Sequence, residues 1–565
     1  MMMINIRLSL VRLPLKQLSF ILMNMSNSGK ALLFLVSSLL LTSLVHGTRD
    51  LSDSNLIKSS CSTTLYPDIC YSTLSTTKTL ATKKDIIEHT INQTKEIIHA
   101  NFHAINKLTT AANVTKRGKI AIHDCLQLAT GTLEALDKVI GDLREYPTKK
   151  SLRRHADDLK TLMSTTITNK ETCLDGFSHD AECKLLRNSI VGGQEHGGKM
   201  CSNALAMIVD MTNTDMLNSK EAKLDVLLQE VSMWPEWLSA GDRKLMQSGD
   251  VTPDVTVAAD GSRDYTSVAA AVAAAPSKST SRYVIKIAAG VYRENVEVPS
   301  SKTNLMFIGD GRSNTIITAS LSVAGGSTTF NSATVVAVGD GFLARDITFQ
   351  NAAGPSGNQA VALRVGADLS AFYRCGILAY QDTLYVHSNR QFFVDCMVVG
   401  TVDFIFGNSA VVLQNCNIQP RRPNPKQKNM ITAQGRTDPN QNTGIVIQKC
   451  TIVANSDLQP VQASFPTYLG RPWKEYSRTV VMQSSISDVI DPAGWYPWDG
   501  DFALDTLYYR EYQNTGPGAD TSNRVTWKGW GVITDVAEAE SFTAGSFIAG
   551  GSWLPSTGFP YSLGL

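Results

Sequence analysis

The sequence predicts two folded domains of different class, an all-α four-helix bundle followed by an all-β parallel β-helix. Apolar residues recur at helical spacing from about residue 56 to residue 209. After residue 250, short β-branched and aromatic runs alternate with Gly, Asn and Asp, which is typical of a β-repeat architecture. A chain of 565 residues is also too long for one ordinary domain. Its hydrophobic content of 43% is enough for large buried cores.

Charge and histidine content exclude several classes of function. Lys and Arg number 52 against 51 Asp and Glu, so the net charge of +1 argues against a nucleic-acid binder. Of the nine histidines, only His387 lies beyond residue 247. Neither a His-rich zinc site nor a Ser-His-Asp hydrolase is therefore expected in the C-terminal half. The chemistry of that half is expected to run without imidazole.

The N-terminal segment 1–47 reads as a signal peptide or a signal anchor. Residues 31–45 are 15 uncharged residues that follow Lys30, whereas spanning a membrane usually takes about 20 apolar residues. Ten cysteines in an exported chain predict disulfides. The two sequons, at Asn92 and Asn113, are glycosylation acceptors if the chain enters the secretory route.

The first domain is expected over residues 55–205. Apolar stripes such as Ile87, Ile91 and Ile98 recur at three-, four- and seven-residue steps and are joined by short polar breaks. Stripes of this length indicate an antiparallel bundle.

Residues 206–247 are expected to form a linker with a processing site. The dibasic pair Arg243-Lys244 lies in a short polar stretch between two unlike domains, where a protease finds accessible backbone. An ordinary solvated charge pair is the alternative interpretation.

The β domain is expected over residues 248–565, with coils of about 20 to 22 residues. Like residues recur at this length: Gln359, Gln381 and Asp403 are each 22 apart, and Cys375, Cys396 and Cys416 are 21 and 20 apart. In a parallel β-helix such residues would stack on adjacent coils roughly 4.8 Å apart.

A column of polar side chains is the candidate site. If the coils stack, Gln359, Gln381 and Asp403 project from one sheet, and Asp382 joins them only at a bend or bulge. Two carboxyl groups so placed should titrate apart, one as an acid and one as an anion. Arg471 near one of them would hold it ionised and oriented.

Acyl transfer would use every member of this set. It needs a nucleophile, a proton donor for the leaving alcohol and donors for the oxyanion, and two carboxyl groups with two amides supply them. Glycoside cleavage also uses paired carboxylates but does not explain the two glutamines. A ladder of Asn and Gln with a buried ion pair that only stabilises the β-helix is the structural alternative.

The chain resembles the plant pectin methylesterases (pectinesterases) over essentially all of residues 250–565. The resemblance is carried by several long motifs in order: Gly290-Val-Tyr-Arg-Glu294, Tyr380-Gln-Asp-Thr-Leu384, Gly400-Thr-Val-Asp-Phe-Ile-Phe-Gly407, Leu469-Gly-Arg-Pro-Trp473 and Leu504-Asp-Thr-Leu-Tyr-Tyr509. It implies a right-handed parallel β-helix.

The resemblance also implies roles for single residues. Asp403 resembles the nucleophile, Asp382 the acid and then the base, and Gln381 a catalytic donor to the oxyanion. The residues expected to bind substrate are Thr329, Gln359, Arg471 and Trp473. The family uses no metal and no organic cofactor.

Residues 55–205 resemble the pectin methylesterase inhibitor domain. That resemblance implies disulfides Cys61–Cys70 and Cys125–Cys173, and the esterase family implies Cys396–Cys416. The pairing of Cys183, Cys201, Cys375 and Cys450 stays open. Residues 1–246 would be a pro-region that a subtilisin-type protease removes near Arg243-Lys244. The pro-region would restrain the esterase before export, or serve folding or retention.

The function expected from these observations is hydrolysis of the C6 methyl esters of homogalacturonan to pectate and methanol. The protein would be secreted and act extracellularly on cell-wall pectin, with inhibitor proteins and the processing protease as partners. Two alternatives are kept: another β-helix pectin enzyme, either a glycosidase or a lyase, and a non-catalytic inhibitor or wall-binding protein.

Overall fold

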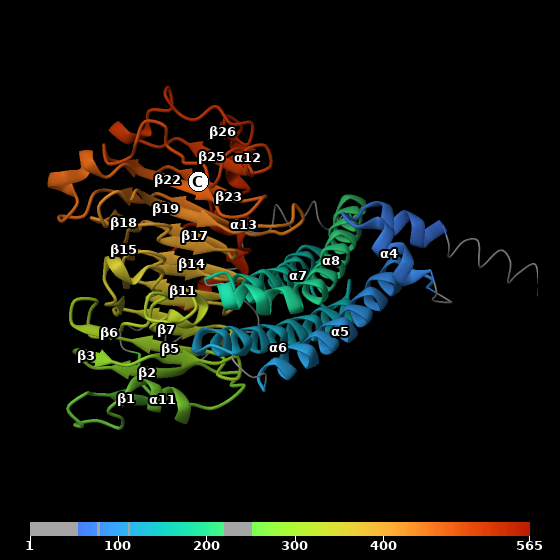
Figure 1. Cartoon of the computed structure of the whole chain (residues 1–565), viewed down its shortest axis with the longest axis horizontal. Coiled ribbons are helices and arrows are strands. Elements are labelled where there is room, and N and C mark those ends of the chain that lie inside the picture. Colours follow the sequence, from blue (N-terminus) through green and yellow to red (C-terminus); the bar gives the residue numbers. More distant parts are fainter. Residues whose placement is uncertain (1–54, 76–79, 111–113, 180, 220–250) are drawn as a thin grey trace, which may run out of the picture.

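The computed structural model describes residues 55–75, 80–110, 114–179, 181–219 and 251–565. Three parallel β-sheets form the C-terminal part of the chain (Figure 1). Among these residues, sheet A has eleven strands: β1 (Val255–Val257), β2 (Tyr283–Ile287), β5 (Leu305–Ile308), β8 (Leu343–Arg345), β11 (Ser370–Tyr373), β14 (Arg390–Val394), β17 (Ala410–Gln414), β20 (Gly444–Gln448), β23 (Arg478–Met482), β25 (Tyr508–Tyr512) and β26 (Trp530–Val532).

The described residues place eight strands in sheet B and seven in sheet C. Sheet B runs β3 (Gly290–Arg293), β6 (Thr315–Ala319), β9 (Thr348–Asn351), β12 (Gly376–Leu378), β15 (Met397–Gly400), β18 (Asn417–Pro420), β21 (Thr451–Ile452) and β24 (Ser485–Ile486). Sheet C runs β4 (Val296–Val298), β7 (Val335–Ala337), β10 (Leu363–Val365), β13 (Leu384–Val386), β16 (Ile405–Gly407), β19 (Asn429–Gln434) and β22 (Thr467–Pro472).

From β2 to β24 most coils give one strand to each sheet in chain order, so the chain winds as a parallel β-helix. Leu363 pairs with Leu384 and Leu384 with Ile405, which sets the coil length at 21 residues here. Between sheets A and B one residue with a left-handed backbone makes the bend, and φ is 50°, 52°, 54° and 54° at Arg374, Asp395, Asn415 and Lys449. The predicted fold class is confirmed.

The interior of the β-helix is apolar and its side chains stack from coil to coil. Phe372 and Phe393, for example, stack with ring centroids 4.5 Å apart. Helix α11 (Val268–Ala274) packs onto this core near β1, and α12 (Val536–Glu540) and α13 (Ala544–Phe547) belong to the apolar layer on sheet A. Burial of these side chains is the main stabilising contribution.

The expected disulfide between Cys396 and Cys416 is wrong, since both are buried free thiols. With Cys375 and Cys450 they form a column, each residue directly after the left-handed bend of its coil. The thiol of Cys396 donates to the backbone carbonyl of Phe372 at 3.4 Å. Because the members of the column are equivalent, spacing alone does not single out a bonded pair.

The N-terminal part is an all-α bundle of α4 (Pro67–Leu74), α5 (Lys83–Leu108), α6 (Lys116–Glu145), α7 (Leu152–Asp175) and α8 (Ala181–Asn218). The expected disulfides Cys61–Cys70 and Cys125–Cys173 are present, and Cys183 and Cys201 are buried. Helix α8 continues to Asn218, into the segment expected as linker, because residues such as Met207, Ile208 and Met211 are buried in the bundle.

Several expected features lie outside the described residues: the segment 1–47, the sequon at Asn113 and the dibasic pair Arg243-Lys244. Asn92 is exposed on α5. In the part of the chain that the structure describes, no helix combines the length and the apolar character needed to cross a bilayer.

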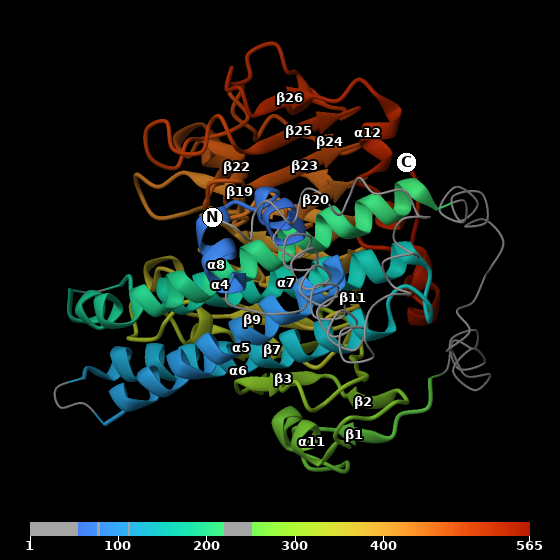
Figure 2. The ribbon, with the colours of Figure 1, turned by 90° about the vertical axis from the view of Figure 1, so that its right-hand side faces the viewer.

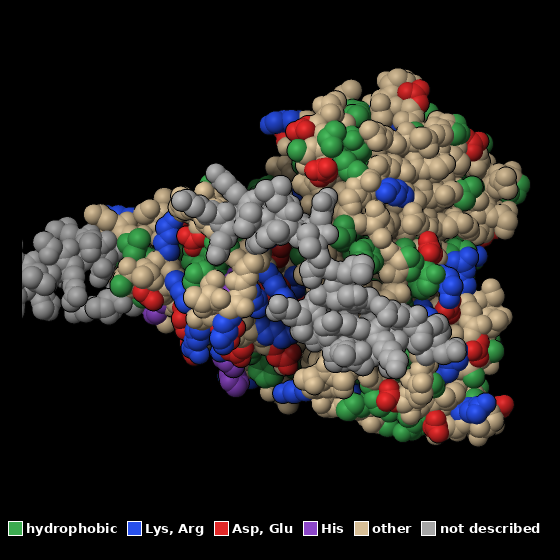
Figure 3. Space-filling view, turned by 180° about the vertical axis from the view of Figure 1, so that it is seen from behind, with side chains coloured by type: hydrophobic (Ala, Val, Ile, Leu, Met, Phe, Trp, Pro, Cys, Tyr) green, Lys and Arg blue, Asp and Glu red, His purple; other side chains and the backbone are tan. Residues whose placement is uncertain are grey.

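The bundle lies across the β-helix, with α6 and α7 against sheet C (Figures 1 and 2). One apolar cluster joins the two parts, with Ile122, Cys125 and Phe177 from the bundle and Tyr385 and Phe406 from sheet C. Seen from behind, Lys, Arg, Asp and Glu gather on the bundle (Figure 3), as expected of solvent-facing helices. The bundle therefore covers one face of the β-helix.

Candidate active site

Asp382 and Asp403 occupy equivalent positions in consecutive coils. Each lies in the turn before a strand of sheet C, Asp382 before β13 and Asp403 before β16. Their offset of 21 residues equals the pairing of Leu384 with Ile405, so the two carboxyl groups belong to neighbouring coils at the same place in the turn.

The expected column of Gln359, Gln381 and Asp403 is wrong by one residue. It assumed 22 residues per coil, whereas the strand pairing sets 21, so that Asp382 and not Gln381 is stacked on Asp403. The bend that Asp382 needed is present, since φ is 62° at Asp382 and 51° at Asp403. A left-handed backbone breaks the strict alternation of a strand, and Asp residues tolerate it better than most.

All the residues expected to act in catalysis or substrate binding nevertheless line one cavity of about 280 Å³. They are Thr329, Gln359, Gln381, Asp382, Asp403, Arg471 and Trp473. They come from the turns before β10, β13 and β16, from β22 and the residue after it, and from the loop before β7. The site is therefore built by successive coils.

Arg471 holds Asp403 in a two-point ion pair. Its Nε donates to Oδ1 at 2.8 Å and one terminal nitrogen donates to Oδ2 at 2.6 Å, with Asp403 only 5% exposed. Trp498 stacks on the guanidinium with its ring centroid 4.3 Å away. Such planar pairing fixes both the charge and the orientation of the carboxylate.

Asp382 is the carboxyl group of the pair whose pKa is raised. Burial raises its pKa well above the usual range, the charge of Asp403 raises it further, and Arg471 only partly opposes both effects. Because Arg471 pairs with Asp403 and not with Asp382, one carboxyl group carries the negative charge and the other keeps its proton. The two carboxyl groups thus differ in their environment.

The two glutamines are available as donors. Gln359 and Gln381 are half-buried and line the cavity, and in the described part of the chain their side chains make no hydrogen bond. Amide N–H groups that are not engaged elsewhere are suited to stabilise a developing oxyanion.

Two aromatic side chains that the sequence interpretation missed, Tyr385 and Phe406, also line the cavity. Tyr385 and Phe406 pair across β13 and β16 and stack at 4.2 Å, and Trp473 meets Phe406 edge-on at 5.9 Å. Each of the first two follows its aspartate by three residues, a repeat that could have revealed them. A Cβ at Gly435 would lie 2.9 Å from the Trp473 ring, so only glycine leaves room for the indole.

The bundle supplies a wall of the same cavity. The residues at and just beyond the C-terminal end of α7 that line it are Thr172, Asp175, Gly176, Ser178 and His179. The Thr172 hydroxyl lies 3.3 Å from the Tyr385 hydroxyl and 3.0 Å from Nε2 of His387. The chain's own helix therefore forms part of the wall of the cavity that holds both aspartates.

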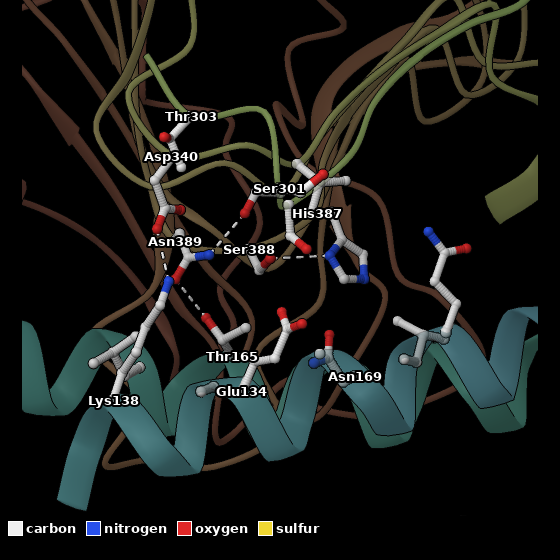
Figure 4. Close-up of a pocket in the computed structure, with 18 of the residues that line it drawn as sticks. Glu134, Lys138, Thr165, Asn169, Ser301, Thr303, Asp340, His387, Ser388 and Asn389 are labelled. Atoms are coloured by element: carbon white, nitrogen blue, oxygen red, sulfur yellow. Dashed lines mark hydrogen bonds and ion pairs between the residues drawn. The ribbon is translucent and has the colours of Figure 1, made fainter. Parts of the chain in front are cut away.

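A second cavity of about 550 Å³ lies between α6, α7 and the β-helix (Figure 4). The Lys138–Asp340 ion pair and the Thr165–Asn389 hydrogen bond, both 2.7 Å, join the two parts beside it. His387 lines this cavity, and burial lowers its pKa to about 3. Asp382 and Asp403 do not line this cavity, and a pKa of about 3 leaves the imidazole of His387 neutral at physiological pH.

Acyl transfer to water is the chemistry for which the aspartate cavity is complete, since a glycosidase has no use for amide donors at an oxyanion. Fold and site together define a carboxylic ester hydrolase with a helical domain over its groove. The chain belongs to the pectinesterase family: the Pectinesterase family model matches residues 254–551, and the Plant invertase/pectin methylesterase inhibitor model matches residues 55–207.

Curated relatives match both parts of the chain. "Pectinesterase 3" of Citrus sinensis is 64% identical over 517 residues, covering 90% of this chain and 88% of the relative. "Pectinesterase/pectinesterase inhibitor U1" of Solanum lycopersicum is 63% identical over 519 residues, covering 90% and 89%.

A solved structure matches the β-helix part alone. "Pectin methylesterase from Carrot" is 75% identical with a TM-score of 0.56, covers 56% of this chain, and is itself covered completely. The solved chain of that relative corresponds to the esterase region alone, and the core of the β-helix here draws only on residues within 251–565.

Proposed function

We propose that this protein hydrolyses the C6 methyl esters of homogalacturonan through Asp403 as nucleophile and Asp382 as acid and base. The observation that carries the proposal is the ion pair of Asp403 with Arg471 beside a buried Asp382 of raised pKa. The names of the relatives support pectin as substrate. We further propose that the protein is secreted and acts on pectin in the cell wall.

In the first step, a carboxylate oxygen of Asp403 attacks the ester carbonyl carbon. The electron pair of the carbonyl moves onto its oxygen, where the amides of Gln381 and Gln359 donate hydrogen bonds. The bond between this carbon and the methoxy oxygen then breaks, and Asp382 gives its proton to the departing oxygen. Methanol leaves, and an acyl group remains on Asp403 as a mixed anhydride.

In the second step, Asp382 acts as the base. It takes a proton from water, whose oxygen attacks the acyl carbon, and the bond from that carbon to Asp403 breaks. The pectin chain leaves with a free carboxylic acid group, which loses its proton to solvent and becomes a carboxylate. Asp403 is an anion again and Asp382 is protonated again. Trp473 would stack on a sugar ring and Thr329 would contact the same chain.

The bundle is proposed to keep the full chain inactive. A polysaccharide needs an open groove, and the end of α7 forms one wall of the cavity that holds both aspartates. Proteolysis near Arg243-Lys244 would separate the two parts and allow the groove to open.

The esterase region, residues 251–565, is expected to release methanol from methylated pectin at least about tenfold faster than the full chain. This is the ratio expected if the bundle is undocked in about one full chain in ten. Methanol release by both proteins at equal concentration measures this. An inert esterase region would refute the esterase proposal. Equal rates would refute inhibition by the bundle, and shortening of the polymer without methanol would indicate a glycosidase or a lyase.

Inhibition by the bundle is expected to weaken as the pH rises, because of Asp124 on α6. Burial raises its pKa to about 6 from an ordinary 3.8, while its hydrogen bond to Thr328 and the charge of Arg364, both on the β-helix, oppose the shift. A pKa raised by docking means that docking is strongest when Asp124 is protonated and weakens as the pH rises through about 6.

Between pH 5 and pH 7.5 this amounts to about a tenfold weaker docking equilibrium. The ratio of esterase-region to full-chain rate should fall across that range in the natural chain and stay flat in Asp124→Asn. Asp210→Asn, which changes an aspartate whose ion pair is with Lys83 inside the bundle, is the control. An unchanged pH profile in Asp124→Asn would rule out this carboxyl group as the cause.

A further inference from the structure

Lys474 follows Trp473, which lines the active-site cavity, and among the described residues its ion pairs are with the bundle. Its Nζ donates to Oδ1 of Asp175 at 3.0 Å and to Oε2 of Glu171 at 3.3 Å, and both partners belong to α7. In the described part of residues 251–565, no Asp or Glu forms an ion pair with it.

One of the two carboxylate side chains that Lys474 binds also lines the catalytic cavity. Asp175, which accepts the hydrogen bond from Lys474, lines the cavity together with Asp382 and Asp403. The ammonium group also lies 5.3 Å from the ring centroid of Trp473, the aromatic side chain beside it in that cavity. Lys474 follows β22, the strand whose Arg471 binds Asp403, so the same segment carries both cations.

Removal of the bundle leaves this ammonium without a counter-ion. Its side chain is 19% exposed while the bundle is docked. An ammonium beside a groove and an aromatic ring is suited to bind an anion. The anion that the proposed reaction itself places in the groove is the carboxylate of a demethylated galacturonate residue.

We propose that Lys474 is a carboxylate-binding subsite of the esterase, which holds a free uronate residue of the same polymer beside the ester under attack. In the full chain, the carboxylates of Asp175 and Glu171 occupy this subsite in place of the substrate. The inference rests on the proposed function and adds a specificity-determining residue to it. Methyl esters are neutral, so the subsite distinguishes partly demethylated pectin from fully methylated pectin.

The test measures KM and kcat for methanol release by residues 251–565 on a highly methylated pectin and on the same pectin after partial saponification. Lys474→Met is expected to raise KM about fivefold on the saponified pectin, because the variant loses one partly exposed ion pair with the substrate. On the highly methylated pectin, KM should stay within about twofold and kcat should be unchanged on both substrates. Lys474→Arg should keep most of the wild-type preference.

The matched control is Lys528→Met, which removes an exposed lysine that lines neither cavity. Inhibition by unesterified trigalacturonate is a second readout, and Lys474→Gln is a second variant. Trigalacturonate should inhibit both Lys474→Met and Lys474→Gln more weakly than it inhibits the wild type. Equal KM and inhibition constants in wild type and variants would overturn the inference, as would an equal loss of kcat on both pectins. A wild-type region that releases no methanol would instead refute the esterase function itself.

Discussion

Replacing Asp403 by Asn in residues 251–565 is expected to lower kcat for methanol release at least about 10³-fold, because the variant has no nucleophile of comparable strength. Asn keeps the size of the side chain. Arg471 loses the carboxylate to which it donates hydrogen bonds of 2.8 and 2.6 Å. KM should change little, since the polymer contacts stay in place.

Asp457→Asn is the matched control for this variant. Asp457 pairs with Arg421 at 3.3 Å and does not line the active-site cavity. The control should keep near-native turnover. Near-native turnover in Asp403→Asn, with folding verified by circular dichroism, would remove Asp403 from the role of nucleophile.

Replacing Asp382 by Asn is expected to lower kcat about 10²- to 10⁴-fold, the contribution of a general acid and base. The loss should depend on the leaving group. Methoxide needs a proton in order to leave, whereas phenoxide is a much better leaving group. With a phenyl ester of an oligogalacturonate, Asp382→Asn should release one burst of phenol and then stall, because water attack still needs the base.

The burst separates the two roles of Asp382. A burst equal to the enzyme concentration, followed by slow turnover, would show that the acyl group accumulates on Asp403. Equal losses on the methyl and the phenyl ester, without a burst, would contradict proton donation by Asp382 and would reduce it to a structural residue.

The fold could be predicted because the periodic spacing of apolar and polar residues is visible in the sequence itself. Helical stripes such as Ile87, Ile91 and Ile98 predicted helices, and these residues are buried in α5. Recurrence at about one coil length predicted a parallel β-helix. Spacing did not give the register, because coils differ in length by one or more residues and a single left-handed bend shifts which side chain faces the groove.

The polar members of the site could be predicted and several apolar ones could not. Asp382, Asp403 and Arg471 carry recognisable chemistry in long motifs. Trp498 comes from a loop after β24, outside the coil repeat, so no spacing relates it to Arg471. The wall contributed by Thr172 lies on another domain, and such a contact depends on docking, which sequence periodicity does not describe.

The central claim is that two aspartates in one cavity hold different protonation states, and a pH titration of ¹³C-labelled aspartate carboxyl groups in residues 251–565 tests it most directly. Asp382 should titrate well above the ordinary aspartate value of about 3.9, and its signal should disappear in Asp382→Asn. Ordinary titration of Asp382, or an elevated signal that belongs to Asp403, would contradict the assignment of acid and nucleophile.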